Sequence, residues 1–128
     1  MHARVRNESN GRVLADRAQV ASTFWRRAKG LLGRGSLAEG EGLLLFPCSS
    51  VHMMGMRFAL DILFTDREGK VVGLVPGLKP WRVAAARGAY LCIELPAGTL
   101  FRTETEVGHT VKAWSGGVEL VLGSLSRS

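Results

Sequence analysis

The stretch Leu60-Asp-Ile-Leu-Phe64 carries the clearest signal about the fold, because its apolar residues occupy both faces of an extended chain. A second stretch, Leu91-Cys-Ile-Glu-Leu95, has the same character. Successive side chains of a strand point to opposite faces, so a strand that is apolar on both faces is typical of a buried, central position. We therefore predict that both strands lie at the centre of a compact small β-barrel or a curved sheet.

Short apolar runs separated by glycine and proline fill most of the remaining chain, as is typical of a compact β domain. The further strands predicted from these runs are residues 12–20, 42–46, 51–54, 71–75, 110–114 and 118–122, and the second central strand extends over 89–95. Glycine-containing turns are expected at 66–69 and 115–117. The predicted fold class is therefore mainly β.

Two segments are expected to be helical. Ser22 or Thr23 offers an N-cap, and apolar residues then recur at helical spacing until glycines at positions 30, 33 and 35 end the pattern. Residues 97–108 are expected to form a short connecting helix followed by a tight return. The complete prediction is an α+β domain of mainly β character, with one prominent helix in its N-terminal half and one short connecting helix.

The 128 residues are predicted to form a single domain, in which a basic N-terminal third (1–34) precedes a β-rich body (42–123). No stretch approaches the roughly 20 apolar residues that a membrane-spanning helix needs, and the first ten residues lack the apolar run of a secretory signal. Two cysteines are too few for a disulfide framework. We expect a cytoplasmic protein with no membrane insertion.

The formal net charge of +6 comes from the N-terminal third, which holds eight Arg or Lys residues against Glu8 and Asp16. The rest of the chain carries equal numbers of both signs. A basic segment of this kind can contact phosphate, so nucleic-acid binding through Arg26, Arg27 and their neighbours is one possible function. A solvated basic face is the commoner explanation, and we favour it.

Asp61 and Glu94 lie inside the two central strands, where a carboxylate has to be ion-paired, hydrogen-bonded or protonated. Arg57, Arg34 and Arg82 are candidate partners. One interpretation is structural, with internal salt bridges or loop N–H groups holding both acids. The other is a polar pocket in which two acids and several arginines bind a small polar ligand.

A second kind of site is suggested by His52 and its sulfur-containing neighbours, because thiolate, thioether and imidazole ligands together favour soft metals such as Cu(I). Cys48, His52 and Met54 are the candidate ligands. In an extended chain, however, His52 and Met54 point to one face and Met53 to the other, and no second Cys/His pair stands at zinc spacing. We therefore expect neither a metal nor another cofactor.

An enzymatic function is the alternative, with His52 as general base and Asp61 or Glu94 as its acid partner in a hydrolase or transferase. The sequence contains no G-x-S-x-G elbow, phosphate-binding Gly-Lys-Ser/Thr loop, dinucleotide fingerprint or H-E-x-x-H helix. Composition alone supports this alternative, so the sequence leaves open whether the chain is an enzyme.

Several motifs, taken in order, resemble the prokaryotic family known as domain of unknown function 192. They are Gly30-Leu-Leu-Gly-Arg34, Gly42-Leu-Leu-Leu-Phe46, the segment from His52 to Asp61, Phe64, Gly69, Pro80-Trp-Arg82 and Leu91-Cys-Ile-Glu-Leu-Pro-Ala-Gly98. The resemblance extends over residues 21–111. It implies a compact, largely β fold with one prominent helix, and it implies no established activity.

The chain departs from that family pattern at two places. His52-Met-Met-Gly-Met56 stands where much of the family has Trp-Met-Lys-Asn-Thr, and Gly108-His109 stands where the family usually has Gly-Asp. We expect His109 to cap a turn. Trp81 lies in an irregular stretch, where it is either a lid or stacking platform, or a core residue under a loop.

Our preferred prediction is a non-enzymatic binding or accessory domain whose polar pocket holds a small polar ligand or a peptide of a protein partner. The residues assigned to this pocket are His52, Arg57, Asp61, Arg82 and Glu94. Three further residues are possible additions: Arg34, Met54 and Trp81. The sequence identifies neither the ligand nor the partner.

Overall fold

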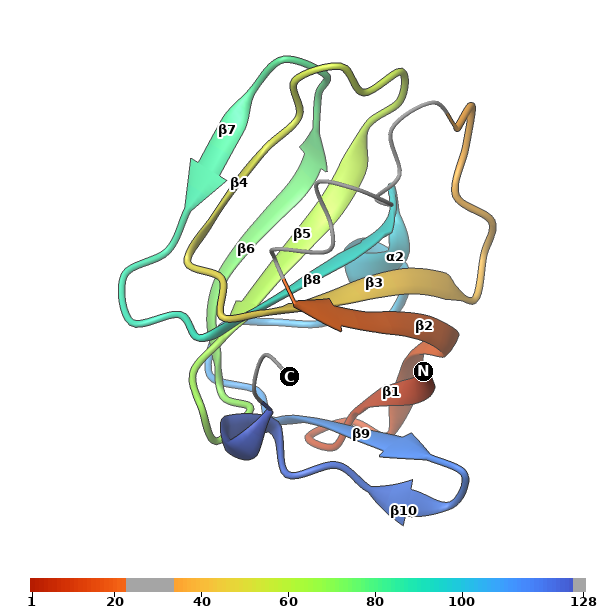
Figure 1. Ribbon diagram of the computed structural model, residues 1–128, viewed down its shortest axis with the longest axis vertical. Coiled ribbons are helices and arrows are strands. Elements are labelled where there is room, and N and C mark those ends of the chain that lie inside the picture. Colours follow the sequence, from red (N-terminus) through yellow and green to blue (C-terminus); the bar gives the residue numbers. More distant parts are fainter. Residues whose placement is uncertain (23–33, 126–128) are drawn as a thin grey trace.

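The computed structural model of the protein describes residues 1–22 and 34–125 (Figure 1). The strands in these residues are β1 (His2–Asn7), β2 (Arg12–Ser22), β3 (Glu41–Phe46), β4 (Ser50–His52), β5 (Leu60–Thr65), β6 (Val71–Leu78), β7 (Val83–Ala85), β8 (Leu91–Pro96), β9 (Val111–Ser115) and β10 (Val118–Glu119). The helices are α2 (Thr99–Arg102) and the 3-10 helix η1 (Leu122–Ser124). The mainly β class and the short connecting helix after residue 97 are thereby confirmed.

The helix predicted to follow Ser22 or Thr23 falls on residues 23–33, which lie outside the described part of the chain, so it stays a prediction. Among the described residues, no helix has the length and apolar character that crossing a membrane requires.

Eight of the strands form one sheet in the order β10-β9-β1-β2-β3-β8-β5-β6. Neighbouring strands pair antiparallel, apart from β2 and β3, which pair in parallel. β3, β8 and β5 are consecutive interior strands of this order, and β5 is buried along its whole length. Residues 91–95 of β8 are buried as well. The central, two-sided burial predicted for residues 60–64 and 91–95 is therefore confirmed.

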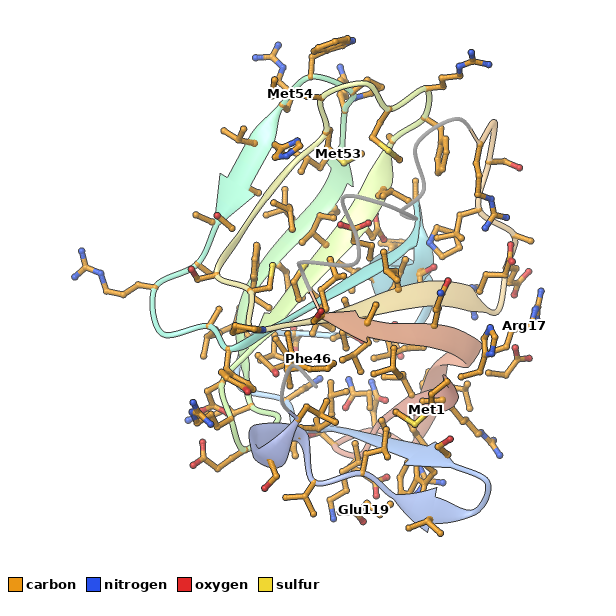
Figure 2. The ribbon with its side chains drawn as sticks, in the orientation of Figure 1. Met1, Arg17, Phe46, Met53, Met54 and Glu119 are labelled. Atoms are coloured by element: carbon orange, nitrogen blue, oxygen red, sulfur yellow. The ribbon has the colours of Figure 1, made fainter. Side chains whose placement is uncertain are left out.

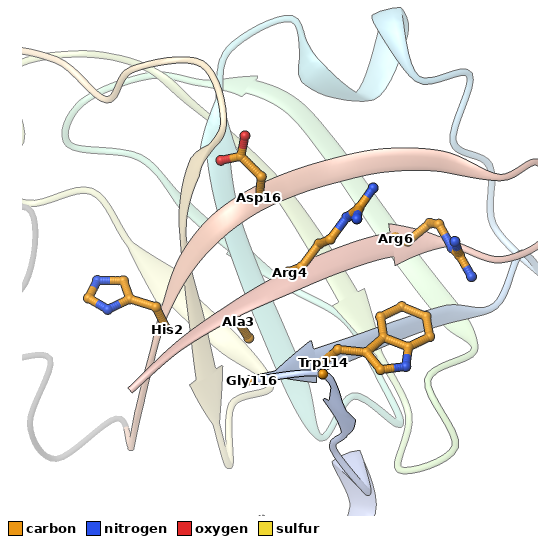
Figure 3. Close-up of a pocket in the computed structure, with 8 residues that line it drawn as sticks. His2, Ala3, Arg4, Arg6, Asp16, Trp114 and Gly116 are labelled. Atoms are coloured by element: carbon orange, nitrogen blue, oxygen red, sulfur yellow. The ribbon is translucent and has the colours of Figure 1, made fainter.

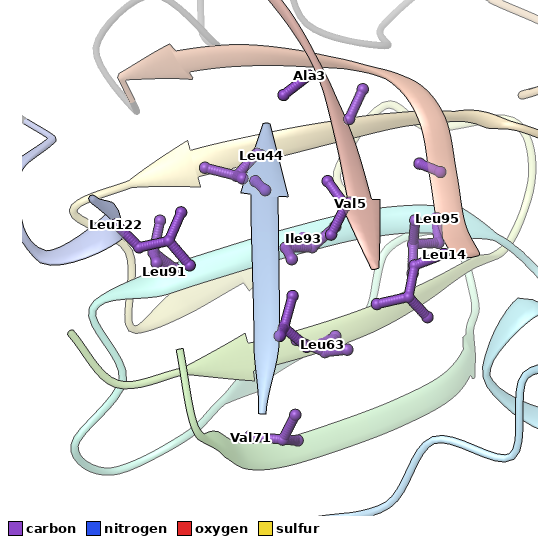
Figure 4. Packing of buried hydrophobic residues seen from close by; sticks show 14 of the residues in the cluster. Ala3, Val5, Leu14, Leu44, Leu63, Val71, Leu91, Ile93, Leu95 and Leu122 are labelled. Atoms are coloured by element: carbon purple, nitrogen blue, oxygen red, sulfur yellow. The ribbon is translucent and has the colours of Figure 1, made fainter. Parts of the chain in front are cut away.

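The first of two apolar cores, core 1, packs β1 and β9 against the three central strands (Figure 4). Val5 of β1 and Ala113 of β9 are fully buried there, together with Leu44, Leu63 and Ile93 from β3, β5 and β8. Full burial of one such aliphatic side chain contributes about 1.5–3 kcal/mol. Core 1 therefore joins the N- and C-terminal strands to the middle of the sheet.

The second core, core 2, lies on the opposite face of the central strands. Leu43, Ile62 and Cys92 enter it from β3, β5 and β8, and Val51 and Met53 enter it from β4 and the residue that follows it. β4 and β7 form a separate two-stranded sheet, which lies beside β5 and β6 in Figure 1. Alternate residues of the central strands thus enter alternate cores, which is why these strands carry apolar residues on both faces.

Within the described residues the strand pairings do not close into a barrel, so the barrel or curved-sheet detail of the prediction is not confirmed. The segments that precede β6 and β9, near opposite ends of the strand order, do meet, because an isolated antiparallel bridge joins Lys70 and Thr110. Val111 N donates to Gly69 O next to this bridge, at 2.8 Å. A Cβ on Gly69, whose φ is +86°, would overlap the carbonyl oxygen of Val111. The contact between the two segments therefore requires glycine.

The sequence prediction omits two strands, β1 and β7. The inward residues of β1 are Ala3, Val5 and Asn7, which are small or polar and give a weak apolar signal. β7 consists of Val-Ala-Ala. Both strands are specified by their neighbours, since β1 pairs with β2 and β9 and β7 pairs with β4.

Candidate functional site

Asp61 is held by the backbone of two other elements. It is 1% exposed and lies on the core 1 side of β5, where its register partner is Leu95. Gly77 N donates to its Oδ1 at 2.8 Å, and Gly98 N and Leu100 N donate to its Oδ2 at 3.1 and 2.8 Å. The carboxylate therefore ties β6 and the start of α2 to β5. These contacts correspond to the structural interpretation, in which loop N–H groups hold an internal acid.

Glu94 is also fully buried, but on the other side of the sheet. Its register partners are Leu43 of β3 and Ile62 of β5, and both belong to core 2. Because Asp61 faces core 1 and Glu94 faces core 2, the sheet itself separates the two carboxylates. The structure therefore does not bring the two acids of the predicted pocket together.

β4 and the residues after it alternate between two environments, as predicted. Met53 is fully buried in core 2, whereas His52 is exposed and Met54 is 53% exposed. Figure 2 labels Met53 and Met54 on this segment. Cys48 is buried in core 2, where its Sγ donates to the carbonyl oxygen of Ser50 at 3.2 Å. The thiol of Cys48 is thus buried in core 2 while His52 and Met54 are exposed, so the structure does not bring the three candidate soft-metal ligands together. The described residues contain no group of three or more His, Cys, Asp or Glu side chains that could hold a metal ion.

Trp81 is an exposed residue and not a core residue under a loop. Trp81 is 68% exposed, and its backbone φ is +69°, in the left-handed region that a bulky residue rarely adopts. Trp81 N donates to Met53 O, and Met53 N donates to Arg82 O, each at 2.8 Å. These two bonds continue the pairing of β4 with β7 and fix the backbone that carries the indole.

Val83 lies beside this tryptophan and is missing from the predicted site. It is the register partner of His52, and it is 70% exposed. Arg82 and Arg57 are exposed as well, and Arg57 lies in the loop that follows β4. Together these side chains form one surface at the end of the small sheet, which we call the β4–β7 surface: His52, Met54, Arg57, Trp81, Arg82 and Val83.

The β4–β7 surface is cationic. Residues 47–60 and 79–90 contain four basic residues, Arg57, Lys79, Arg82 and Arg87, and no Asp or Glu. None of the four forms an ion pair with another residue in the described ranges. The predicted site omits Lys79 and Arg87. The absence of Asp and Glu from both stretches is the feature of the sequence that could have indicated these two basic residues.

The basic residues of the N-terminal third are, by contrast, largely paired. Arg6, Arg12 and Arg17 contact carboxylates of Glu8, Glu104 and Asp16 at 2.7, 3.1 and 2.8 Å. The hydrogen bond between Arg6 and Glu8 raises the pKa of the arginine and lowers the pKa of the glutamate. The positive charge that the sequence concentrates in residues 1–34 is thus largely neutralised where the structure describes it, while Arg26 and Arg27 lie outside the described residues.

Arg34 is placed away from the acids that the prediction assigns to it. Its Nη2 donates to Glu41 Oε1 at 3.0 Å, and Ala38 N donates to the same oxygen at 2.8 Å. The bond from Ala38 N, and then the bond from Arg34, hold the pKa of Glu41 below its usual value. Arg34 therefore stabilises the turn that precedes β3, and the structure does not place it on the β4–β7 surface.

His109 caps a turn, as predicted. Its Nδ1 accepts a hydrogen bond from Glu106 N at 3.2 Å, and His109 N donates to Glu106 O at 3.1 Å. Asn7 Nδ2 lies 2.9 Å from the same Nδ1 of His109, and Asn7 Nδ2 also donates to Thr105 Oγ1 at 3.3 Å. Because Nδ1 accepts from Glu106 N, the proton of the neutral ring is carried by Nε2. The residue is part of a polar network that fixes residues 105–109 against β1.

Two solved structures share this fold. A protein of unknown function from Novosphingobium aromaticivorans has a TM-score of 0.72 and 24% sequence identity, with 87% of this chain and 83% of that chain covered. A protein from Sinorhizobium meliloti 1021 has a TM-score of 0.74 and 23% identity, with 88% and 92% covered. At this identity the likeness concerns the fold alone.

The sequence comparisons identify the family. A model of DUF192, described as Uncharacterized ACR, matches residues 5–113, and the chain belongs to this family. UPF0127 proteins of Thermococcus sibiricus and Pyrococcus furiosus are 30% and 31% identical to it, over 82% and 83% of this chain and 71% and 94% of theirs. The resemblance stated from the sequence motifs is thereby confirmed. The family has no known function, and no enzymatic role is shown for it.

Proposed function

We propose that the chain is a non-enzymatic binding domain, and that its β4–β7 surface binds an acidic peptide segment of a partner protein. One observation carries this proposal. Trp81 is held outward in a strained backbone conformation, at φ +69°, by two backbone hydrogen bonds: Trp81 N donates to Met53 O, and Met53 N donates to Arg82 O. Backbone strain of this kind costs about 1–3 kcal/mol and persists mainly where function requires it.

The side chains around Trp81 have the composition of a protein-binding surface. Met54 and Val83 are 53% and 70% exposed beside the indole, so three large apolar side chains share one end of the molecule. Tryptophan and methionine are enriched in interfaces, and a tryptophan is a frequent energetic centre of one. The aliphatic neighbours favour a peptide with apolar side chains over a ligand made of phosphates and sugars.

The charge of the surface selects the sign of the partner. Arg57 and Arg82 belong to the surface itself, and the two sequence stretches that contribute them, residues 47–60 and 79–90, add Lys79 and Arg87 and contain no carboxylate. A peptide with Asp or Glu beside an apolar residue would neutralise this charge, whereas a basic peptide would be repelled. The predicted small-ligand pocket is replaced by an open surface, since Asp61 and Glu94 lie inside the two cores.

The enzymatic alternative finds little support in the geometry. His52 is exposed on the outer side of β4, whereas Glu94 faces core 2 and Asp61 faces core 1. The three backbone donors on Asp61 occupy its carboxylate. A general base needs its acid partner within about 3 Å or one water molecule. We therefore favour binding over catalysis.

We further propose that the whole chain is one cytoplasmic domain. Support comes from the central strands, which contribute to both cores, and from the meeting of the two ends of the strand order at the Lys70–Thr110 bridge, which favours a curved, nearly closed sheet. Cys48 and Cys92 are buried thiols, as is usual in a reducing compartment.

The proposal is tested with a fluorescein-labelled peptide rich in Asp and Glu that contains one leucine. Fluorescence anisotropy of this peptide, titrated with the protein, gives the dissociation constant. Trp81→Ala and Arg82→Ala are each expected to weaken binding about tenfold or more. Phe101→Ala and Arg102→Ala are the matched controls, because Phe101 is 89% exposed on α2, away from this surface. Equal losses in both pairs of variants would overturn the proposal.

A labelled single-stranded oligonucleotide provides the second arm of the experiment. The solved relative from Sinorhizobium meliloti has been proposed to be a transcription regulator, and basic residues around an aromatic ring can also stack a nucleobase. The proposal predicts that the oligonucleotide competes poorly with the peptide. Tighter binding of the oligonucleotide, lost in Trp81→Ala, would replace the peptide by a nucleic acid as the partner of this surface.

A further inference from the structure

A groove on the outer side of β1 and β9 lies apart from the β4–β7 surface, and the proposed function leaves it without a role. Its volume is about 530 Å³, which is in the range of small-molecule sites. Residues of β1, β2 and β9 and of the β9–β10 turn line it, among them His2, Arg4, Arg6, Asp16, Trp114 and Gly116 (Figure 3). We propose that this groove binds a nucleoside monophosphate.

The pairing of β1 with β9 brings guanidinium groups to an aromatic ring. Arg4 is the register partner of Trp114, and Arg6 follows two residues later on the same side of β1. The guanidinium carbon of Arg6 lies 4.8 Å from the centre of the indole, so a cation–π contact orients the ring. Directly opposite residues of an antiparallel pair have Cβ atoms about 5 Å apart. Arg4 and Trp114 are therefore close enough to contact one small ligand.

Arg4 supplies the positive charge that a ligand can use. Arg6 Nε donates to Glu8 Oε2 at 2.7 Å, and Arg17 Nη1 donates to Asp16 Oδ1 at 2.8 Å, so these arginines are already matched with acids. Arg4 is exposed, and its guanidinium makes no hydrogen bond or ion pair with another residue of the described ranges. The planar fork of a guanidinium fits two oxygens of one phosphate group.

A β-bulge in β2 adds a carboxylate to the rim of the groove. The β1–β2 register slips at Arg4, so that Asp16 and Arg17 together stand opposite it. The N–H groups of both residues donate to one acceptor, the carbonyl oxygen of Gly40, at 3.0 Å each. Bulges re-aim side chains and are frequent beside functional sites. Here the bulge places Asp16 where its carboxylate can accept hydrogen bonds from vicinal sugar hydroxyls, which is the role of an acid in many nucleotide sites.

Three different chemistries thus converge in one groove. Arg4 suits a phosphate, Trp114 offers a ring on which a base can stack, and Asp16 suits the hydroxyls of a ribose. A free phosphate ion would use Arg4 alone, and an aromatic carboxylate would give Asp16 no donor beyond Arg17. A nucleoside monophosphate uses all three groups, and a molecule of this size fits the volume of the groove.

The test is a titration of the full chain with AMP, followed by NMR of the tryptophan indole N–H signals and of the backbone amides. Trp114→Phe assigns the Trp114 signal among the three tryptophans of the chain. AMP is expected to shift the Trp114 indole signal and the amides of residues 2–6 and 114–117. Arg4→Ala is expected to raise the dissociation constant for AMP about tenfold, as the loss of one charge-assisted contact does.

Arg12→Ala is the matched control, since Arg12 is an exposed β2 arginine that pairs with Glu104 and does not line the groove. It is expected to leave AMP binding within about twofold of the unchanged protein. Adenosine and inorganic phosphate are expected to bind about tenfold more weakly than AMP or worse. No AMP-induced shift at millimolar concentration, equal losses in Arg4→Ala and Arg12→Ala, or phosphate binding as tight as that of AMP would each overturn the proposal. If Arg4→Ala loses the spectrum of a folded protein, Arg4→Lys takes its place in the test. This variant keeps the charge and is expected to retain part of the affinity.

Discussion

Replacement of Asp61 by asparagine tests whether this buried acid is a structural anchor. The carboxylate accepts three backbone N–H bonds, from Gly77, Gly98 and Leu100, at 2.8, 3.1 and 2.8 Å. An asparagine oxygen can serve one side of this set, so at least one buried donor loses its acceptor, which costs about 1–3 kcal/mol. The bonds that remain lose their charge assistance, at about 1 kcal/mol each. Relief of carboxylate desolvation offsets part of this sum, and we expect Asp61→Asn to lower the free energy of unfolding by about 2–4 kcal/mol.

Urea denaturation at 25 °C and pH 7, followed by tryptophan fluorescence, measures this change. Asp66→Asn is the matched control, because Asp66 Oδ1 accepts two backbone N–H bonds, from Glu68 and Lys70 at 2.9 Å each, in an exposed turn. Water replaces those bonds, so its effect is expected to stay below about 1 kcal/mol. An Asp61→Asn protein that is as stable as the unchanged chain, or more stable, would contradict the anchoring role, since it would identify Asp61 as a strained functional acid.

Three further substitutions test other parts of the structure. Met53→Ala is expected to lower the free energy of unfolding by about 2–5 kcal/mol, because Met53 is buried in core 2. Met54→Ala is expected to change it by less than about 0.5 kcal/mol, because Met54 is exposed. Similar urea midpoints for both variants would contradict the orientation of β4. Gly69→Ala, at a φ of +86° against the Val111 carbonyl, is expected to lower the free energy of unfolding by about 2–4 kcal/mol in thermal or urea denaturation. Gly77→Ala, at a φ of +62° in open space, is expected to lower it by about 1 kcal/mol. A larger loss in Gly77→Ala than in Gly69→Ala would argue against the Lys70–Thr110 bridge. The pKa of Glu41 is lowered by the hydrogen bonds from Ala38 N and Arg34, so the contribution of Glu41 to stability is present above its unfolded pKa and is lost as the pH falls through its folded pKa. The stability difference between Glu41→Gln and the unchanged chain should therefore be greatest at neutral pH and shrink on acidification, and a difference that grows on acidification would contradict this.

The two central strands are predictable because a strand buried on both faces leaves a local signature. Leu60-Asp-Ile-Leu-Phe64 is apolar at every position but one, and no partner needs to be known to recognise this. The same reasoning orders the residues of one strand into two faces, and it places His52 and Met54 correctly on one side and Met53 on the other. Local alternation was sufficient wherever the question concerned a single strand.

The geometry of the candidate site depended on relations between strands, which a sequence does not contain. Asp61 and Glu94 each have a defined parity, but whether they share a face depends on the register between β5 and β8, and a shift of one residue reverses the answer. The observed register aligns Ile62 with Glu94, and so it separates the acids. The pairing of Arg12 with Glu104 was hidden for the same reason, because these residues are 92 positions apart.

Strand β7 and the exposure of Trp81 were beyond local patterns as well. Pro80-Trp-Arg82 has no periodicity, and Val83–Ala85 is too short and too small to indicate a strand. The strand exists because β4 offers it a partner, and the outward position of Trp81 follows from the bonds to Met53. The resemblance to DUF192 included this tryptophan in a motif, yet its position on the surface became clear only from the tertiary structure.

Trp81→Gly separates the two consequences of the strained backbone. Glycine adopts a φ of +69° without steric cost, so the variant is expected to unfold with a free energy that is unchanged or up to about 1 kcal/mol higher, while peptide binding is lost. Glu104→Gly, at a second non-glycine residue of positive φ in the described part of the chain, is the control for stability without an effect on binding. Loss of stability in Trp81→Gly together with unchanged binding would show that the indole packs and does not recognise.

The most direct test of the proposed β4–β7 surface is an NMR map of the backbone amides during titration with the acidic peptide. The largest shifts are expected on residues 50–57 and 79–85, around Trp81, and the amides beside Asp61 and Glu94 are expected to stay unchanged. Shifts centred on those two acids would restore an internal pocket, and shifts spread over the N-terminal strands would assign binding to the basic segment. Either pattern would contradict the assignment of recognition to the β4–β7 surface.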